Sequence, residues 1–155
     1  MLEIIISTFR YYLPAFASNF CIMMFWFATG RKVFFKVSKK WFGSNKGYDG
    51  LFIGAIVGGI AGLLVSTFWL GFALGIGTWF GNCANSFFKR RIGIKSGGKL
   101  PVFDQLDFIM GATFFGAAIM PPTIPEFIII IIATPFLHIS ANIILFKIGI
   151  KKVPY

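Results

Sequence analysis

Long apolar stretches separated by short polar or basic segments form the main pattern of this sequence. A membrane-spanning helix needs about 20 mostly apolar residues. Four stretches reach or approach this requirement: Leu2–Ala28, Leu51–Phe68, Phe108–Met120 with its flanks, and Phe127–Phe146. A fifth, Trp69–Phe88, is also long enough, which makes Ser66–Leu70 a tight turn. The pattern predicts an all-α integral membrane protein with a bundle of five transmembrane helices.

Basic residues test this prediction, because Lys and Arg near membrane spans collect on the cytoplasmic side. With five spans, the three basic segments 31–46, 89–99 and 147–152 all fall on one face. This predicts an outer N-terminus, a cytoplasmic C-terminus and a multi-pass protein of the cell membrane. Arg10 falls outside these segments and either reaches the outer surface or marks a polar cavity.

Composition agrees with a membrane location and narrows the possible partners. The 155 residues are 57% hydrophobic and 13% charged, whereas a soluble domain carries about 25% charged residues. A net charge of +10 could indicate nucleic acid, an anionic membrane surface or an anionic substrate. Because the cations flank apolar spans, we expect membrane lipids and an anionic substrate, no nucleic acid and no obligate protein partner. Residues 1–155 read as a single membrane-embedded domain.

Small residues and prolines predict how the helices pack and where they end. Gly54, Gly58 and Gly62 recur at every fourth residue, a spacing that allows close helix contact in lipid. A cluster of prolines at 121, 122 and 125 is expected to separate the last two helices. The two cysteines, Cys21 and Cys83, lie inside apolar stretches, which favours packed thiols over a disulfide.

Two aspartates follow a basic segment on the predicted cytoplasmic face. Asp104 and Asp107 come soon after Pro101, so we expect them in the first turns of a helix, where positions i and i+3 share a face. Two like charges this close require compensation, and Mg²⁺ is typically held by one or two carboxylates plus substrate phosphates. The alternative is a helix cap, with Asp104 at the positive end of the helix dipole and Asp107 paired to a Lys or Arg.

The preceding residues combine cations with glycines, an arrangement that suits a polyphosphate. Glycines let backbone N–H groups approach phosphate oxygens, while Lys and Arg neutralise charge on a phosphoryl group in transfer. The candidate phosphate ligands here are Lys89, Arg90, Lys95, Ser96, Gly97, Gly98 and Lys99. Lys46, in the polar loop Gly43–Gly50, could complete the site, although the loop glycines could simply turn the chain into the next helix.

Uncharged polar residues inside the spans are the remaining candidates. Asn82 and Asn85 share a helix face one turn before Lys89, so we expect them and Asn19 to face the cavity. His138 has no second His or Cys at ligand spacing, which favours a packing role over metal binding.

At these residues the chain resembles the CDP-archaeol synthase family, the archaeal relatives of CDP-diacylglycerol synthases. The resemblance covers nearly the whole chain and rests on Pro14-Ala15, Ala17-Ser18-Asn19, the Gly43–Gly50 loop, Gly81-Asn82, Lys89-Arg90, Lys95-Ser96, Gly98-Lys99, Pro101 and Asp104-Gln105-Leu106-Asp107. One departure is Lys46-Gly47, where relatives commonly have Lys-Thr.

The resemblance implies a CTP-dependent cytidylyltransferase of archaeal phospholipid biosynthesis. It would convert 2,3-bis-O-(geranylgeranyl)-sn-glycerol 1-phosphate and CTP to CDP-archaeol and pyrophosphate with Mg²⁺ as cofactor. Asp104 and Asp107 would hold the metal and, with Lys89 and Lys95, support catalysis at the cytoplasmic face. The substrate-binding residues would be Asn19, Lys46, Asn82, Asn85, Arg90, Ser96, Gly97, Gly98 and Lys99.

Two other functions remain open from the sequence. A CTP-dependent polyprenol or dolichol kinase would also need Mg²⁺ and a cationic pocket, but it would release CDP. A small membrane transporter or scaffold would use the carboxylates for a transported ion or for pairing with lysines.

Overall fold

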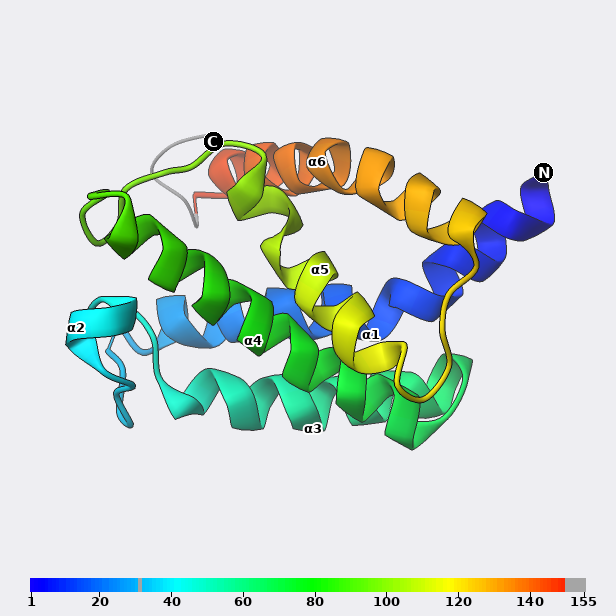
Figure 1. Ribbon diagram of the computed structural model, residues 1–155, viewed down its shortest axis with the longest axis horizontal. Coiled ribbons are helices and arrows are strands. Elements are labelled where there is room, and N and C mark those ends of the chain that lie inside the picture. Colours follow the sequence, from blue (N-terminus) through cyan, green and yellow to red (C-terminus); the bar gives the residue numbers. More distant parts are fainter. Residues whose placement is uncertain (31, 150–155) are drawn as a thin grey trace.

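The protein is a bundle of helices in a computed structural model that describes residues 1–30 and 32–149 (Figure 1). Within those residues the only regular strand pairing is one bridge between Lys36 and Gly47. The helices are α1 (Leu2–Ala28), α2 (Lys39–Phe42), α3 (Tyr48–Val65), α4 (Phe68–Arg91), α5 (Phe103–Gly116) and α6 (Ile124–Lys147). The predicted basic residues Arg31, Lys151 and Lys152 lie outside the described residues.

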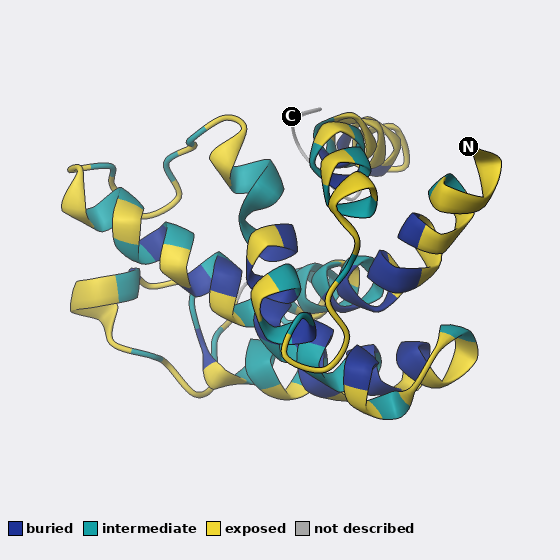
Figure 2. Cartoon of the chain, turned by 45° about the vertical axis from the view of Figure 1, so that its right-hand side comes forward, coloured by how far each residue is buried: buried dark blue, intermediate teal, exposed yellow. Residues whose placement is uncertain are grey.

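Three of the described helices, α1, α3 and α6, are long and apolar enough to cross a membrane. The 24-residue α4 is equally long but more polar, and the 14 residues of α5 extend only about 21 Å. The helical membrane fold is thus confirmed, whereas the count of five spans and the orientation of the termini stay predictions. Large apolar side chains such as Leu64, Phe114 and Ile124 are exposed. Exposed residues occur along the outer faces of the helices, where a bilayer would cover apolar side chains (Figure 2).

Glycines bring the central helices into backbone contact, as their spacing predicts. A Cβ at Gly58 would overlap the Gly71 carbonyl, which shows how closely α3 approaches α4. On another face of α4, a Cβ at Gly81 would overlap the carbonyl of Asp107. Gly77 meets α5 in the same way at Gly111. The glycines therefore determine how close α5, and with it Asp107, lies to α4.

Buried apolar side chains from α1, α4, α5 and α6 form the core. Leu74, Phe108 and Ile130 are among the fully buried members. The Tyr12 hydroxyl lies 2.8 Å from the Thr113 hydroxyl, which links α1 to α5. These contacts hold α5 beyond its first turns. The short helix α2 and the loop after α4 lie at the opposite end of the molecule from the N-terminus (Figure 1).

The structure tests the predictions for the α3–α4 turn, the prolines and the cysteines. The turn between α3 and α4 is short, and the Thr67 hydroxyl caps α4 by accepting from the Leu70 N–H. Pro125 is a correction: it lies in the first turn of α6, where a proline needs no N–H partner, and not in the preceding break. Cys21 and Cys83 are both free thiols, as predicted.

Two polar residues of uncertain role have local partners. Arg10 is exposed and its guanidinium donates over 3.4 Å to the carbonyl of Val65, the last residue of α3. His138 Nδ1 lies 3.2 Å from the Asn142 side-chain amide one turn along α6. This contact within one helix agrees with the predicted packing role.

Candidate active site

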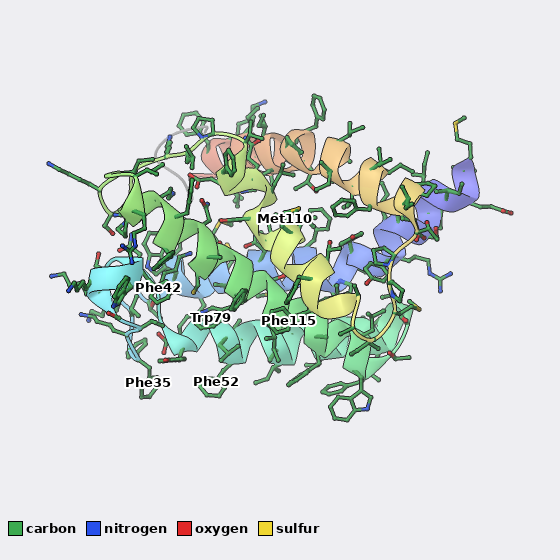
Figure 3. All side chains as sticks on the ribbon, in the orientation of Figure 1. Phe35, Phe42, Phe52, Trp79, Met110 and Phe115 are labelled. Atoms are coloured by element: carbon green, nitrogen blue, oxygen red, sulfur yellow. The ribbon has the colours of Figure 1, made fainter. Side chains whose placement is uncertain are left out.

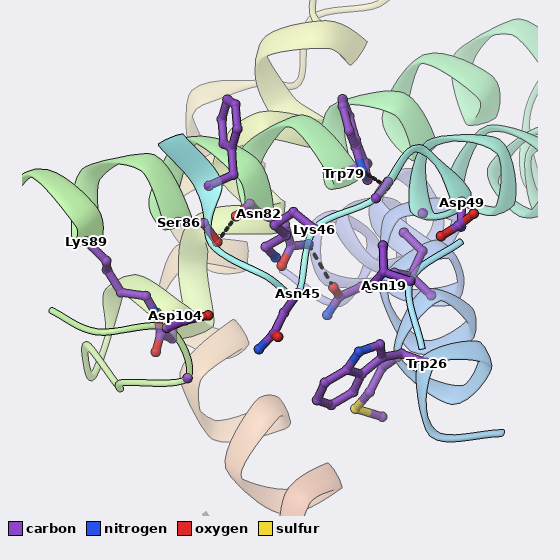
Figure 4. A pocket seen from close by; sticks show the side chains of 18 of the residues that line it. Asn19, Trp26, Asn45, Lys46, Asp49, Trp79, Asn82, Ser86, Lys89 and Asp104 are labelled. Carbon is purple, nitrogen blue, oxygen red and sulfur yellow. Dashed lines mark hydrogen bonds and ion pairs between the residues drawn. The ribbon is translucent and has the colours of Figure 1, made fainter. Parts of the chain in front are cut away.

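A polar cavity of about 340 Å³ lies where α1, α3 and α4 meet the two basic loops (Figure 4). One part of its wall is apolar and aromatic, with Ile22, Met23 and Trp26 from the end of α1. The polar part consists of Asn19, Lys32, Asn45, Lys46, Asp49, Asn82, Ser86, Lys89, Arg90, Ser96, Gly97, Gly98, Lys99 and Asp104. The structure therefore brings most of the predicted site residues, distant in sequence, to one open cavity.

Cations reach this cavity from four segments. Lys32 comes from the loop after α1, and Lys46 from the loop before α3. Lys89 and Arg90 come from the last turn of α4, and Lys99 from the loop before α5. The Arg90 Nε atom is buried and has no hydrogen-bond partner among the described residues. An unpaired buried donor is costly, so an anion that accepted from it would stabilise the site.

The loop that carries Lys46 is fixed on both sides. The Trp79 indole N–H donates to the Gly47 carbonyl over 2.8 Å, and the Asp49 carboxylate accepts from the backbone N–H groups of residues 34 and 35. The Lys46 side chain itself has no hydrogen-bond or ion-pair partner in the described part of the chain. Loss of hydration among the cavity walls lowers the pKa of the Lys46 amine, which makes a bound anion its natural counter-charge.

The two aspartates share one donor, the side-chain amide of Asn85. Asn85 Nδ2 donates to Asp104 Oδ1 over 2.7 Å and to Asp107 Oδ2 over 2.9 Å. Asp104 Oδ1 also accepts from Lys89 Nζ over 2.8 Å, and Asp104 Oδ2 accepts from the Leu100 N–H over 2.9 Å. The expectation that both carboxylates point the same way is confirmed.

This geometry bears on the helix-cap alternative. Asp104 lies in the first turn of α5, where the helix dipole favours a negative charge, but α5 has no side-chain cap hydrogen bond. The Asp104 carboxylate accepts instead from the Leu100 N–H, which lies before the helix. Asp107 has no Lys or Arg partner within the part of the chain that the structure describes, so the alternative fits the position of Asp104 and not Asp107.

The start of α5 is also strained. Val102, which precedes the helix, has φ +67°, a backbone conformation that a β-branched residue rarely adopts. Strain of this kind costs about 1–3 kcal/mol and is often found at functional sites. It determines the direction in which α5 begins and so the placement of Asp104.

The carboxylate pair supplies the kind of oxygen ligands that a Mg²⁺ site requires. Mg²⁺ takes oxygen ligands and often uses one or two carboxylates, with waters and substrate phosphates in its other positions. The described residues hold no cluster of three or more His, Cys, Asp or Glu side chains, so any metal here would depend on such outside ligands. The donor set of Asp104 and Asp107 thus fits Mg²⁺ held together with a nucleotide.

Not every predicted residue reaches the cavity. Asn19 and Asn82 do, joined by a hydrogen bond of 3.1 Å. Lys95 is exposed and lies outside the cavity wall, so its predicted phosphate contact stays a prediction. Asp107 and Asn85 border a second, apolar groove between α4 and α5.

The sequence interpretation missed several wall residues. Trp26 and Met23 lie on the cavity side of α1, and Trp79 anchors the Lys46 loop. Their spacing offered a signal, because Met23 and Trp26 lie one and two turns after Asn19, and Trp79 lies one turn before Asn82. Because these side chains are apolar, the sequence indicated only that they belong to spanning helices.

A cavity lined by cations beside paired carboxylates, in a bundle with helices long and apolar enough to cross a membrane, is the arrangement expected of a membrane enzyme that handles phosphates. The family model described as CarS-like, CDP-archaeol synthase, matches residues 1–155. The chain belongs to the CDP-archaeol synthase family and is therefore a nucleotidyltransferase.

Individual relatives agree with this assignment. CDP-archaeol synthase of Methanococcoides burtonii is 38% identical over 73% of this chain and 81% of its own length. The Methanocaldococcus jannaschii enzyme of the same name is 33% identical over 97% of each chain. A solved structure of an intramembrane enzyme for archaeal membrane lipids biosynthesis superposes with a TM-score of 0.74 at 28% identity, over 87% of this chain and 92% of the other.

Proposed function

We propose that this protein is a Mg²⁺-assisted CTP:lipid-phosphate cytidylyltransferase at the cytoplasmic face of the cell membrane. Its acceptor would be 2,3-bis-O-(geranylgeranyl)-sn-glycerol 1-phosphate, and its products CDP-archaeol and pyrophosphate. The relatives named CDP-archaeol synthase support this substrate class. The observation that carries the proposal is the convergence of Lys46, Lys89 and Arg90 with Asp104 on one cavity.

The reaction needs positioning and charge neutralisation more than proton transfer. An oxygen of the lipid phosphate forms a bond to the α-phosphorus of CTP, and the bond from that phosphorus to the β-phosphate oxygen breaks. Because the phosphate nucleophile is already anionic near neutral pH, no general base is required. Among the described residues, the cavity wall contains no His and no Cys, which is consistent with this chemistry.

The cavity cations would bind the phosphates of CTP. Lys46 and Arg90 come from different segments. Among the described residues, the Lys46 amine has no hydrogen-bond or ion-pair partner, and the buried Arg90 Nε has no hydrogen-bond partner. Lys89 lies between Asp104 and the Gly98 carbonyl, so it can neutralise charge where the glycine loop and the carboxylates meet. The apolar wall around Trp26 and Met23 offers a surface on which a pyrimidine ring can pack.

Asp104 and Asp107 would hold the Mg²⁺ ion. Bound there with the nucleotide, the ion would neutralise charge on the phosphates during transfer. Asn85 keeps the two carboxylates together through its shared amide, which limits the rearrangement needed for binding.

The test is product identification with purified protein in detergent or liposomes. CTP labelled in its α-phosphate, Mg²⁺ and a panel of diether and diacyl glycerol phosphates should give labelled CDP-lipid and one pyrophosphate per turnover. A polyprenol or dolichol kinase would instead transfer the γ-phosphate of CTP to a polyprenol and release labelled CDP. Absence of CDP-lipid with every phosphate acceptor would overturn the proposal.

A further inference from the structure

A second, larger cavity lies between α4 and α5 and differs in character from the first. This α4–α5 groove has a volume of about 600 Å³, within the roughly 300–1,000 Å³ of small-molecule sites. Its wall is almost entirely apolar and includes Phe80, Ala84, Phe88, Phe103, Met110 and Phe114. Met110 projects from α5 in Figure 3.

The exposure of these side chains shows that the α4–α5 groove opens outward. Phe80 is 48% exposed, Met110 50% and Phe114 74%, so the groove would open to the hydrocarbon of a bilayer. Phe88 and Phe103 stack at a ring distance of 6.3 Å and link its two walls. Bulk lipid alone could cover such a surface.

The polar end of the groove distinguishes it from an ordinary lipid-facing surface. Its wall also includes Asp107 and Asn85, and an ionisable residue beside an apolar membrane surface is costly and usually functional. Asn85 donates to Asp107 and to Asp104, and Asp104 lines the polar cavity. The carboxylate pair therefore stands between the two cavities, with one member on each.

This division matches an amphiphilic substrate better than a single pocket would. A nucleotide suits the cationic cavity, whereas a hydrocarbon chain suits the groove. From Asp107 to Phe114 the α5 wall extends about 10 Å, enough for roughly eight carbons of an extended chain.

We propose that the α4–α5 groove binds a hydrocarbon chain of the lipid phosphate, with its phosphate at the Asp107 end. Lipid and nucleotide then reach the carboxylate pair from separate cavities, and the lipid enters sideways from the bilayer. The inference rests on the proposed function for the identity of the lipid, and it adds where that lipid binds.

Photolabelling of the unaltered chain tests the site directly. The probe is a diether glycerol phosphate that carries a diazirine about eight carbons from the glycerol. We expect labelled peptides from α4 and α5 around Ala84, Met110 and Phe114. Excess unlabelled diether glycerol phosphate should suppress this labelling, whereas the same diether without its phosphate should not.

A groove-filling variant gives a second, kinetic measurement. Ala84→Trp places an indole in the groove, and Ala141→Trp adds the same side chain at an exposed position of α6. For Ala84→Trp, the ratio of kcat/KM for a long-chain acceptor to that for a short-chain acceptor should fall about tenfold, equivalent to losing about two buried methylene groups. The ratio for Ala141→Trp should stay at that of the unaltered protein.

The outcomes separate this inference from the proposed function. Labels on α1 or α6 alone, or labels that the phosphate-free diether suppresses equally, would overturn the groove assignment even when the same preparation makes CDP-lipid. An unchanged ratio in a folded Ala84→Trp protein would also overturn it. Failure to form any CDP-lipid would instead contradict the proposed function, while labelling by the lipid phosphate would still decide where that lipid binds.

Discussion

Lys89 Nζ lies 2.8 Å from Asp104 Oδ1, the one ion pair among the described residues, and the same amine donates to the Gly98 carbonyl. This single side chain therefore joins the end of α4, the glycine loop and the start of α5. It also supplies the positive charge that a metal ion would bring to the same carboxylate.

We expect Lys89→Gln to separate metal binding from turnover. Without the ammonium group, Asp104 has less competing positive charge, so the Mg²⁺ concentration for half-maximal activity should fall. The turnover number should fall by about 100-fold, because a charge that stabilises the transferring phosphates is lost. Titration of activity with Mg²⁺ measures both quantities.

Lys36→Gln serves as the matched control, because Lys36 is exposed and lies outside the cavity wall. It should leave both quantities unchanged. A Lys89→Gln protein with a normal turnover number and a normal Mg²⁺ requirement would show that the ion pair only stabilises the fold.

Asp107→Asn is expected to abolish most turnover without unfolding the protein. The amide oxygen can still accept from Asn85, but it offers a weaker ligand to Mg²⁺ and carries no charge. The turnover number should fall by roughly 100-fold or more, with melting temperature and detergent-solubilised size unchanged. Glu3→Gln, at an exposed carboxylate of α1, controls for loss of charge alone. Retained activity with an unaltered metal requirement would leave Asp107 with a purely structural role.

The lowered pKa of Lys46 predicts a pH dependence of CTP binding. An ordinary lysine has a pKa near 10.5, and burial lowers that of Lys46, so its amine loses its proton at a lower pH than a surface lysine. If the protonated amine binds phosphate, KM for CTP rises as the pH increases toward 10.5. CTP binding should also take up protons in this range, because the bound anion favours the charged form.

Lys46→Arg provides the comparison, because an arginine stays protonated throughout this range. Its KM for CTP should change little with pH, whatever its absolute value. Equal pH slopes in Lys46→Arg and the unaltered protein would assign the pH dependence to another group.

A substitution at Gly81 is expected to change both the stability of the fold and the activity of the site. A methyl group at this position would overlap the Asp107 carbonyl, so Gly81→Ala must push α5 away from α4. We expect a loss of about 1–3 kcal/mol in unfolding free energy, together with lower activity. Thermal unfolding and turnover measure the two effects, and Ala73→Val, at a half-buried position of α4, controls for added bulk. Normal activity in Gly81→Ala would mean that Asp107 tolerates displacement.

Much of the fold could be predicted because helices in a membrane follow apolar runs. The α1 bounds agree with the predicted stretch, since the few polar residues in Leu2–Ala28, such as Arg10 and Asn19, do not interrupt its apolar run. For the run that becomes α5, the helix starts at Phe103 and stops at Gly116, ahead of the predicted Met120. Asp104 lies in the first turn of this helix, as its position after Pro101 predicted, although the apolar run itself begins only at Phe108.

The candidate site was predictable where its geometry is local. Asp104 and Asp107 are separated by one helical turn, and that spacing alone places them on one face. Their bridge through Asn85 depends on how closely α4 approaches α5, which no local pattern specifies. Likewise, the contact of Trp79 with Gly47 joins residues 32 positions apart and could only be seen in three dimensions.

The position of the carboxylate pair between the polar cavity and the apolar α4–α5 groove has a consequence for the fate of the products. Pyrophosphate, which is multiply charged, would leave through the cationic cavity into the cytosol. The nucleotide-bearing lipid would slide back along the α4–α5 groove and remain in the membrane plane. Two exits into different phases would keep the products apart after each turnover, so the reverse reaction would require both to return by separate routes.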